Sequence, residues 1–395
     1  MGTSATLFKA FDIEVRVHWS FFLILVYGAF YSSGASSALI GALYGILLIL
    51  LLFVCVTLHE FGHALVAKHF KINVPHITLL PIGGVASLER MPDKPLQEFF
   101  IAIAGPLVNF AIAGVLLPLL LIFGDFPSAV WNLPQIARLM NQMQAPGVTN
   151  LLTYLVVTNL ALGIFNLLPA FPMDGGRVLR ALLALGISYV DATRIAVFVG
   201  RIMAALFALW GIIDVNIFML LIAFFIYVGG GSEREAVESR AVLRNILAEQ
   251  ALPHHAVNLY SSERVDRAVD LIMSSYQTDY PVLDLAGRYL GVLTRARLIY
   301  ALKEIGPDAR IVDVMLKAEA IPVCAPDQDL SVVWEVMATG GSRVVAVKRG
   351  HEFLGLLTLD DISEVFQVYG AKLAGPGRAA ATTPPSQPKP EGVDA

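Results

Sequence analysis

The stretch LIGALYGILLILLLFVCVTLHEFGH, residues 39–63, decides how this chain folds. Residues 39–57 carry no charge and are long enough to cross a lipid bilayer as a helix. Residues 58–63 then add two histidines and a glutamate to the end of that helix. An ionised side chain inside a bilayer costs roughly 2.5–3.5 kcal/mol even on lenient insertion scales. Polar residues at this place therefore indicate a function.

The composition predicts a polytopic α-helical membrane protein that also has a soluble part. Of the 395 residues, 56% are hydrophobic and only 15% are charged, and charged residues become frequent after about Gly230. The net charge of −4 and the lack of any Lys/Arg-rich run argue against a nucleic acid as partner. The two cysteines, Cys55 and Cys324, provide neither a disulfide framework nor a cysteine metal cluster.

Six apolar segments predict a six-span membrane domain over residues 1–230: 19–31, 39–67, 99–123, 151–168, 195–213 and 215–228. The loops on one side of these spans hold most of the basic residues, and the opposite loops hold only Arg138. By the positive-inside rule, both termini face the cytosol of a multi-pass protein in the cell membrane. Residues 58–63 then fall toward the cytosolic end of the second span.

The segment VPHITLLPIGGVASLE, residues 74–89, predicts a strand pair at the membrane surface. Ile77 and Leu79 alternate with Thr78, and Pro81, Gly83 and Gly84 supply the turn. Residues 231–244 are expected to be a helical connector, and residues 371–395 a disordered tail rich in proline, alanine and threonine.

The histidines of the second span predict a metal site. Residues four apart share one face of a helix, so His59 and His63 can bind one divalent metal ion, for which zinc is the best match. Glu60 follows the first histidine directly and can act as a general base on a water molecule at the metal.

A third ligand must come from elsewhere, and acidic residues within the spans are few. The segment FNLLPAFPMDGGR, residues 165–177, ends the fourth span with an unwound backbone at Pro169 and Pro172. Its acid, Asp174, also lies at the cytosolic end of a span. The alternative interpretation is that Asp174 only caps a short helix that begins near Gly176.

These motifs, together with GPLVN at residues 105–109, resemble the site-2 protease family of intramembrane zinc metalloproteases. The resemblance implies that His59, His63 and Asp174 hold the zinc ion and that Glu60 is the base. It also implies a substrate whose transmembrane segment is cut within the bilayer to release a signalling fragment.

Two further groups of residues are candidates for substrate contact. The strand pair with Gly83 and Gly84 could bind an unwound substrate as an added strand. Asn166 could bind that strand or stabilise an oxyanion. For Asn109, hydrogen bonding that only holds two helices together is an equally good interpretation.

The second half of the chain contains a repeat. GVLTRARL, residues 291–298, returns as GLLTLDDI, residues 355–362. Residues 245–370 thus resemble a cytosolic α/β tandem of CBS domains, a module that implies binding of AMP, ADP or ATP. Thr358 and Asp361 match the nucleotide contacts of that family, whereas Arg297 replaces the aspartate in the first copy. A module that only forms a homodimer remains the alternative.

The sequence therefore predicts an intramembrane zinc metalloprotease that is modulated through its CBS domains and acts on membrane-bound regulatory proteins. Two other classes of function stay open. CBS pairs also occur beneath ion channels and transporters, where intramembrane His and Asp would line an ion path. An inactive scaffold that binds membrane helices is the other possibility. Glu60 favours the protease, because an ion path needs no base beside two ligands at helical spacing.

Overall fold

The computed structural model describes the following residues: 4–374 without 33–37, 82, 90, 91, 93, 124–144, 245, 254, 255, 275 and 276. Arg138 and most of the predicted tail lie outside these residues. The chain folds into two compact units, Met1–Arg234 and Glu235–Ala395. Helix α8, Ile217–Leu243, is continuous across the division and includes most of the predicted connector.

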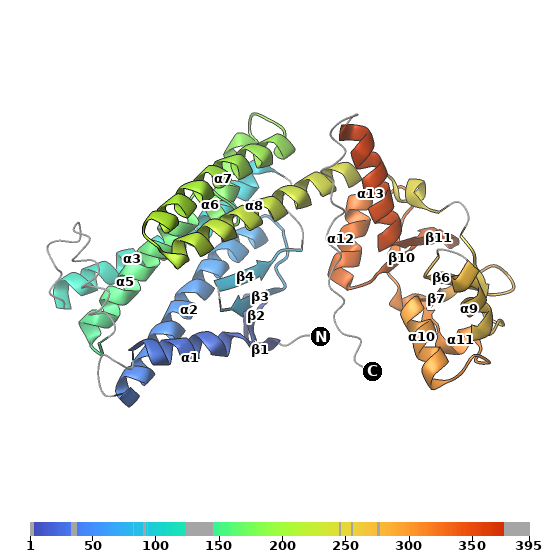
Figure 1. Cartoon of the computed structure of the whole chain (residues 1–395), viewed down its shortest axis with the longest axis horizontal. Helices are drawn as coiled ribbons and strands as arrows, with labels where there is room; N and C mark the ends of the chain where they lie inside the picture. Colours follow the sequence, from blue (N-terminus) through green and yellow to red (C-terminus); the bar gives the residue numbers. More distant parts are fainter. Residues whose placement is uncertain are drawn as a thin grey trace. The chain divides into compact units, whose positions relative to one another are not determined.

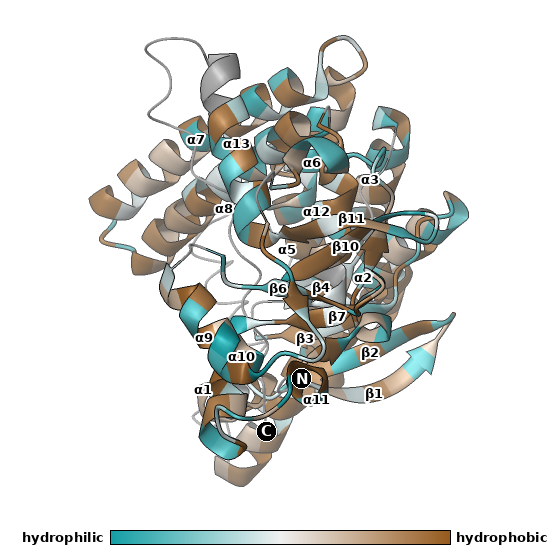
Figure 2. Ribbon diagram, turned by 90° about the vertical axis from the view of Figure 1, so that its right-hand side faces the viewer, coloured by the Kyte–Doolittle hydropathy of each residue, from teal (hydrophilic) through white to brown (hydrophobic). Residues whose placement is uncertain are grey.

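Five helices of the first unit are long and apolar enough to cross a membrane: α2 (Ala38–His69), α3 (Pro95–Phe123), α5 (Val148–Asn166), α7 (Tyr189–Ile213) and α8. Hydrophobic residues cover much of their length (Figure 2). The first predicted span forms α1, Phe21–Ser32, which is shorter than the others. Several long apolar helices are therefore shown, while the count of six spans stays a prediction.

A four-stranded sheet packs beside α2, with the strand order β1-β2-β3-β4 (Figure 1). The predicted strand pair is confirmed as the antiparallel hairpin of β3 (His76–Leu80) and β4 (Gly83–Ser87). The strands β1 (Ser4–Ala10) and β2 (Ile13–His18) were not predicted.

Strand β2 forms because its apolar residues alternate with polar ones. Ile13, Val15 and Val17 are buried and pack in one core with residues of β3 and of α2, including Phe61 and Ala64. The sheet is thereby fixed to the helix that carries the two histidines, and it ends at β4 as an edge strand.

The chain leaves α5 at Asn166 and turns back into α6, Asp174–Leu183. Two glycines make this tight turn possible. A Cβ atom on Gly175 would lie 2.3 Å from the carbonyl oxygens of Leu167 and Leu168, and one on Gly176 would lie 2.7 Å from the backbone of Ala170. The turn therefore folds directly onto the first residues of α6.

The second unit contains two α/β repeats. The first repeat consists of β5 (Leu259–Tyr260), α9 (Val265–Ser274), β6 (Tyr280–Leu283), β7 (Tyr289–Leu293) and α10 (Arg295–Glu304). The second consists of β9 (Val323–Cys324), α12 (Leu330–Gly340), β10 (Val344–Arg349), β11 (Glu352–Thr358) and α13 (Leu359–Ala374). Between the repeats lie α11 (Ile311–Val314) and β8 (Leu316–Lys317), and β8 extends the first sheet.

In each repeat a short parallel strand pairs with the first strand of an antiparallel hairpin. A shared apolar cluster joins the two repeats. It includes Val292 from the first repeat and Val344 and Leu356 from the second.

Candidate metal centre

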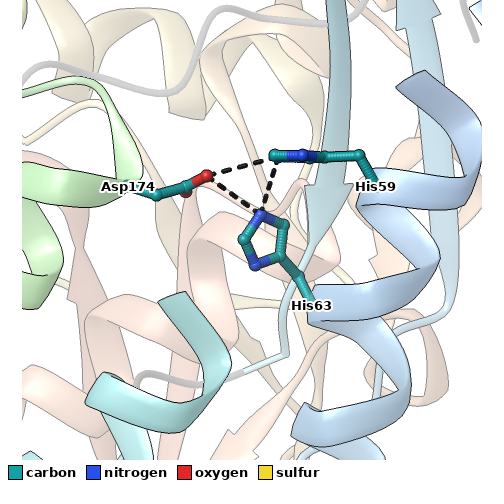
Figure 3. A group of neighbouring side chains, drawn as sticks. All are labelled: His59, His63 and Asp174. Atoms are coloured by element: carbon teal, nitrogen blue, oxygen red, sulfur yellow. Dashed lines mark hydrogen bonds and ion pairs between the residues drawn. The ribbon is translucent and has the colours of Figure 1, made fainter. Parts of the chain in front are cut away.

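The metal centre begins with two histidines on one face of α2. The imidazoles of His59 and His63 are both buried, and their Nε2 atoms lie 3.0 Å apart. Asp174, the first residue of α6, points into the same space, and its Oδ2 atom lies 3.2 Å from each Nε2 (Figure 3). The structure thus brings together three residues from two helices that are far apart in the sequence.

The alternative role of Asp174 as a helix cap finds no support in this geometry. The cap position of α6 is Met173, whose side chain makes no capping hydrogen bond. Of the Asp174 carboxylate, the Oδ2 atom faces the two histidines.

A chain of hydrogen bonds fixes which nitrogen of His59 carries the proton. The chain begins at the backbone carbonyl of Leu155, which accepts from Asn159 Nδ2 at 2.8 Å. Asn159 Oδ1 accepts from Asn109 Nδ2 at 2.9 Å, and Asn109 Oδ1 lies 2.5 Å from His59 Nδ1. Because a carbonyl can only accept, each amide has one orientation, and His59 Nδ1 must be the donor.

The second histidine is oriented by the backbone of α3. Its Nδ1 atom lies 2.7 Å from the carbonyl oxygen of Ile101, which can only accept. Both imidazoles therefore present an Nε2 lone pair to Asp174 and to each other. Outer hydrogen bonds of this kind are what metal-binding histidines normally have.

Three observations show that this site fits a zinc ion. Asp174 Oδ2 is buried and has no hydrogen-bond donor in the described part of the chain, so a cation would satisfy it. The ligand separations of 3.0 and 3.2 Å are close to the roughly 3.3 Å edge of a tetrahedron with zinc–nitrogen bonds of about 2.05 Å. A Cβ atom on Gly105 would lie 2.2 Å from His63 Nε2, so the glycine keeps this space open.

A cavity of about 390 Å³ opens onto the three ligands. Glu60, Asn166, Gly83 and Gly84 all line it, so the structure brings these predicted residues to one place. Gly84 is in close contact with Glu60, because a Cβ atom at residue 84 would lie 2.6 Å from Glu60 Cγ. Edge strand β4 therefore runs directly beside the candidate base.

The chain is similar in sequence to known zinc metalloproteases. A model of the peptidase family M50 matches residues 47–209, and models of the CBS domain match residues 252–304 and 311–367. The chain is 31% identical over 374 residues to a zinc metalloprotease of Methanocaldococcus jannaschii, which covers 94% of this chain and 98% of the relative. The chain belongs to peptidase family M50, the site-2 protease family.

Two further similarities extend over the same regions. Rip3 of Mycobacterium tuberculosis is 27% identical to this M50 peptidase over 398 residues, 94% of each chain. A solved site-2 protease from Methanocaldococcus jannaschii is 38% identical and covers 58% of this chain and 95% of its own, with a TM-score of 0.42. The M50 peptidase is thus a multi-pass membrane zinc metalloendopeptidase with tandem CBS domains.

The other predicted site, at Thr358 and Asp361, lies at the start of α13. Asp361 Oδ2 accepts from the backbone nitrogen of Thr358 at 2.8 Å, and Thr358 Oγ1 accepts from the backbone nitrogen of Asp361 at 3.1 Å. This is a reciprocal capping box, so the pair has a structural role in addition to any ligand contact. Burial raises the pKa of the Asp361 carboxyl above its usual value.

Two residues of the site were missed by the sequence analysis. Asn159 supports His59 through Asn109, and Arg177 lines the cavity one helical turn after Asp174. For Asn159, an amide within a membrane span was the available signal, because such a group needs a partner there. For Arg177, the signal was its spacing of three residues from Asp174 on one helix.

Proposed function

We propose that this M50 peptidase cleaves transmembrane segments of membrane-bound regulatory proteins, with His59, His63 and Asp174 as zinc ligands and Glu60 as the general base. The convergence of the three ligand atoms beside Glu60 in one cavity carries this proposal. Such cleavage would release a signalling fragment from the membrane.

The zinc ion, Glu60 and Asn166 have different roles in the proposed reaction. Zinc, when bound, polarises the scissile carbonyl and lowers the pKa of water to about 7. The Glu60 carboxylate takes the proton from the attacking water and passes it to the leaving amine nitrogen. Asn166, at the end of α5, donates from its side-chain amide to the substrate backbone or to the developing oxyanion.

Edge strand β4 is the proposed binding site for the substrate backbone. A substrate helix must unwind before its peptide bond can be cut, and the freed backbone groups need new partners inside the membrane. Strand β4 pairs only with β3 among the described strands, so its other edge can accept an added strand. Gly84 lets strand β4 approach Glu60 closely, and Gly83 adopts a positive φ at the start of the strand.

The proposed orientation places both termini in the cytosol and the protein in the cell membrane. It rests on the concentration of lysine and arginine in the loops on one side of the spans. The metal centre then lies toward the cytosolic end of α2, from which water can reach the cavity.

The CBS domains are proposed to bind an adenine nucleotide in the second repeat and to modulate cleavage, with a homodimer through these domains as the other possible role. Thr358 and Asp361 would contact the nucleotide. Helix α8 runs from the last candidate span into this unit without a break, so it offers a covalent route for coupling.

Co-expression with candidate single-span regulators tests the proposed function. Glu60→Gln should keep zinc and lose cleavage, because an amide cannot take the proton while the ligands are untouched. His59→Ala should lose zinc and cleavage together. Appreciable cleavage by Glu60→Gln would show that the assigned base is wrong.

A further inference from the structure

Arg180 on α6 is the most deeply buried cation of the described membrane unit, with 1% of its surface exposed. Its Nε and Nη2 atoms donate to Glu98 Oε1 on α3 at 2.9 and 2.5 Å, and Nη1 donates to Glu233 Oε1 on α8 at 2.6 Å. The rings of Phe171 and Tyr189 each lie 4.8 Å from its guanidinium carbon. We call Arg180, Glu98 and Glu233 the Arg180 triad.

Stability alone is a weak explanation for the triad. Removing two carboxylates and a guanidinium from water is costly, and well-packed apolar residues often stabilise a core as well or better. A planar guanidinium between two carboxylates and two rings does fix direction, because its donors form a rigid fork. The triad therefore links α3, α6 and α8 through bonds of defined direction.

Two of these three helices contribute to the metal site: α6 carries the ligand Asp174, and α3 orients the ligand His63. Arg180 lies on the same helix as Asp174, and its stacking partner Phe171 belongs to the turn just before Asp174. On α3, Glu98 lies less than one helical turn before Ile101, whose carbonyl fixes the ring of His63. The hydrogen bonds from Arg180 to Glu98 thus connect α3, which orients His63, to α6, which carries Asp174.

The third helix connects the triad to the CBS unit. Glu233 lies at the end of the membrane unit, and α8 continues from it into the second unit. We propose that Arg180 is a positioning residue for the zinc ligands and that Glu233 makes their spacing depend on the position of α8. Metal sites tolerate changes in ligand distance of only about 0.2 Å, so a small shift of α6 against α3 would change zinc affinity.

Metal affinity of the full-length protein in detergent tests this proposal, with Co²⁺ as a coloured probe. Glu233→Gln keeps an oxygen acceptor for Arg180 but removes the charge that holds it. We expect its dissociation constants for Co²⁺ and Zn²⁺ to rise about tenfold, which is the lower end of the effect of changing direct partners of metal ligands, because Glu233 acts through Arg180. The visible Co²⁺ absorption should also change shape, because the ligand geometry changes.

Glu235→Gln is the matched control. It removes the same charge two residues later on α8, and Glu235 has no ion pair or hydrogen-bonded side-chain partner among the described residues. Its affinity and spectrum should equal those of the natural protein. If Glu233→Gln also kept both and only lowered the melting temperature, the triad would merely stabilise the fold and the proposal would be wrong.

A second variant covers the case in which Glu233→Gln does not fold. Glu233→Asp retains the charge but moves the carboxylate by one methylene. If Glu233 acts by positioning, the metal affinity should fall; if only its charge matters, the metal affinity should not change. The inference rests on the proposed ligand set, and Asp174→Asn separates the two ideas. Full zinc content in Asp174→Asn would refute the ligand set, whereas zinc loss there with natural affinity in both Glu233 variants would refute only the triad.

Discussion

Gly105→Ala should abolish zinc binding without unfolding the protein. The new Cβ atom would lie 2.2 Å from His63 Nε2 and 2.6 Å from His59 Nε2. Ordinary van der Waals contact begins at 3.4 Å, so the ring of His63 must retreat by 1.2 Å (3.4 − 2.2). This is about six times the 0.2 Å that metal–ligand distances tolerate, so a three-ligand zinc site cannot persist.

The backbone of α3 should not suffer from this substitution. Alanine is favoured over glycine in a helix by about 1 kcal/mol, so the effect on the metal and the effect on the helix have opposite signs. Gly114→Ala is the matched control in the same helix, because no heavy atom lies within 4 Å of its new Cβ atom. Any gain in helix propensity should appear in both variants.

The assay is zinc content per purified chain, followed by Co²⁺ titration of the metal-free protein. We expect Gly105→Ala to hold little zinc and to bind Co²⁺ at least a hundredfold more weakly, whereas Gly114→Ala stays at one ion per chain. Full zinc content in Gly105→Ala would refute the placement of the metal between the two Nε2 atoms and Asp174.

Three further predictions concern the other candidate residues. Asp174→Asn should lower zinc content sharply, because an amide is a much weaker ligand than a carboxylate; near-normal zinc would favour the helix-cap role. Gly84→Ala should keep zinc but lower the cleavage rate at least tenfold, since its Cβ atom would lie 2.6 Å from Glu60 Cγ and displace the base. Asp361→Glu should have the melting temperature of the natural protein, because glutamate completes a capping box with Thr358, but it should bind ATP more weakly. Asp361→Ala should have both a lower melting temperature and a weaker affinity for ATP. Unchanged binding of AMP, ADP and ATP in both variants would remove Asp361 from the nucleotide site.

Much of the metal centre could be predicted because its signals are local. The spacing of His59 and His63 places them on one helical face whatever the rest of the fold does. Asp174 could be found because prolines end its span at the same side of the membrane. The hairpin of β3 and β4 also followed from alternation and turn residues within sixteen positions.

What the sequence analysis missed depends on contacts between distant segments. Asn109 lies 50 residues from His59, and Arg180 lies 82 residues from Glu98, so no periodic pattern connects them. Asn109 was left between two roles for this reason, and the structure shows that it holds a histidine. Strand β2 carries a period-two pattern, but its place beside β3 depends on how α1 and α2 return the chain.

The two CBS repeats carry opposite charges at equivalent positions, so they are not expected to bind a nucleotide equally well. Asp279 directly precedes the hairpin of the first repeat, and its carboxylate accepts from Thr278 Oγ1 at 2.8 Å. Arg343 has the corresponding position in the second repeat, and its carbonyl accepts from Leu359, the first residue of α13. A helix N-terminus attracts anions.

In the first repeat the residue before the hairpin is an aspartate, whose carboxylate would repel a phosphate. In the second repeat the equivalent residue is Arg343, and the carboxylate of Asp361 accepts from the backbone nitrogen of Thr358. We therefore expect a phosphate-bearing nucleotide to prefer the second repeat. A nucleotide that binds one end of the module more tightly than the other would act on the two repeats unequally. Such unequal binding shifts a regulatory equilibrium only if the nucleotide also has different affinities for two arrangements of the protein, because a ligand that binds both arrangements equally well shifts nothing.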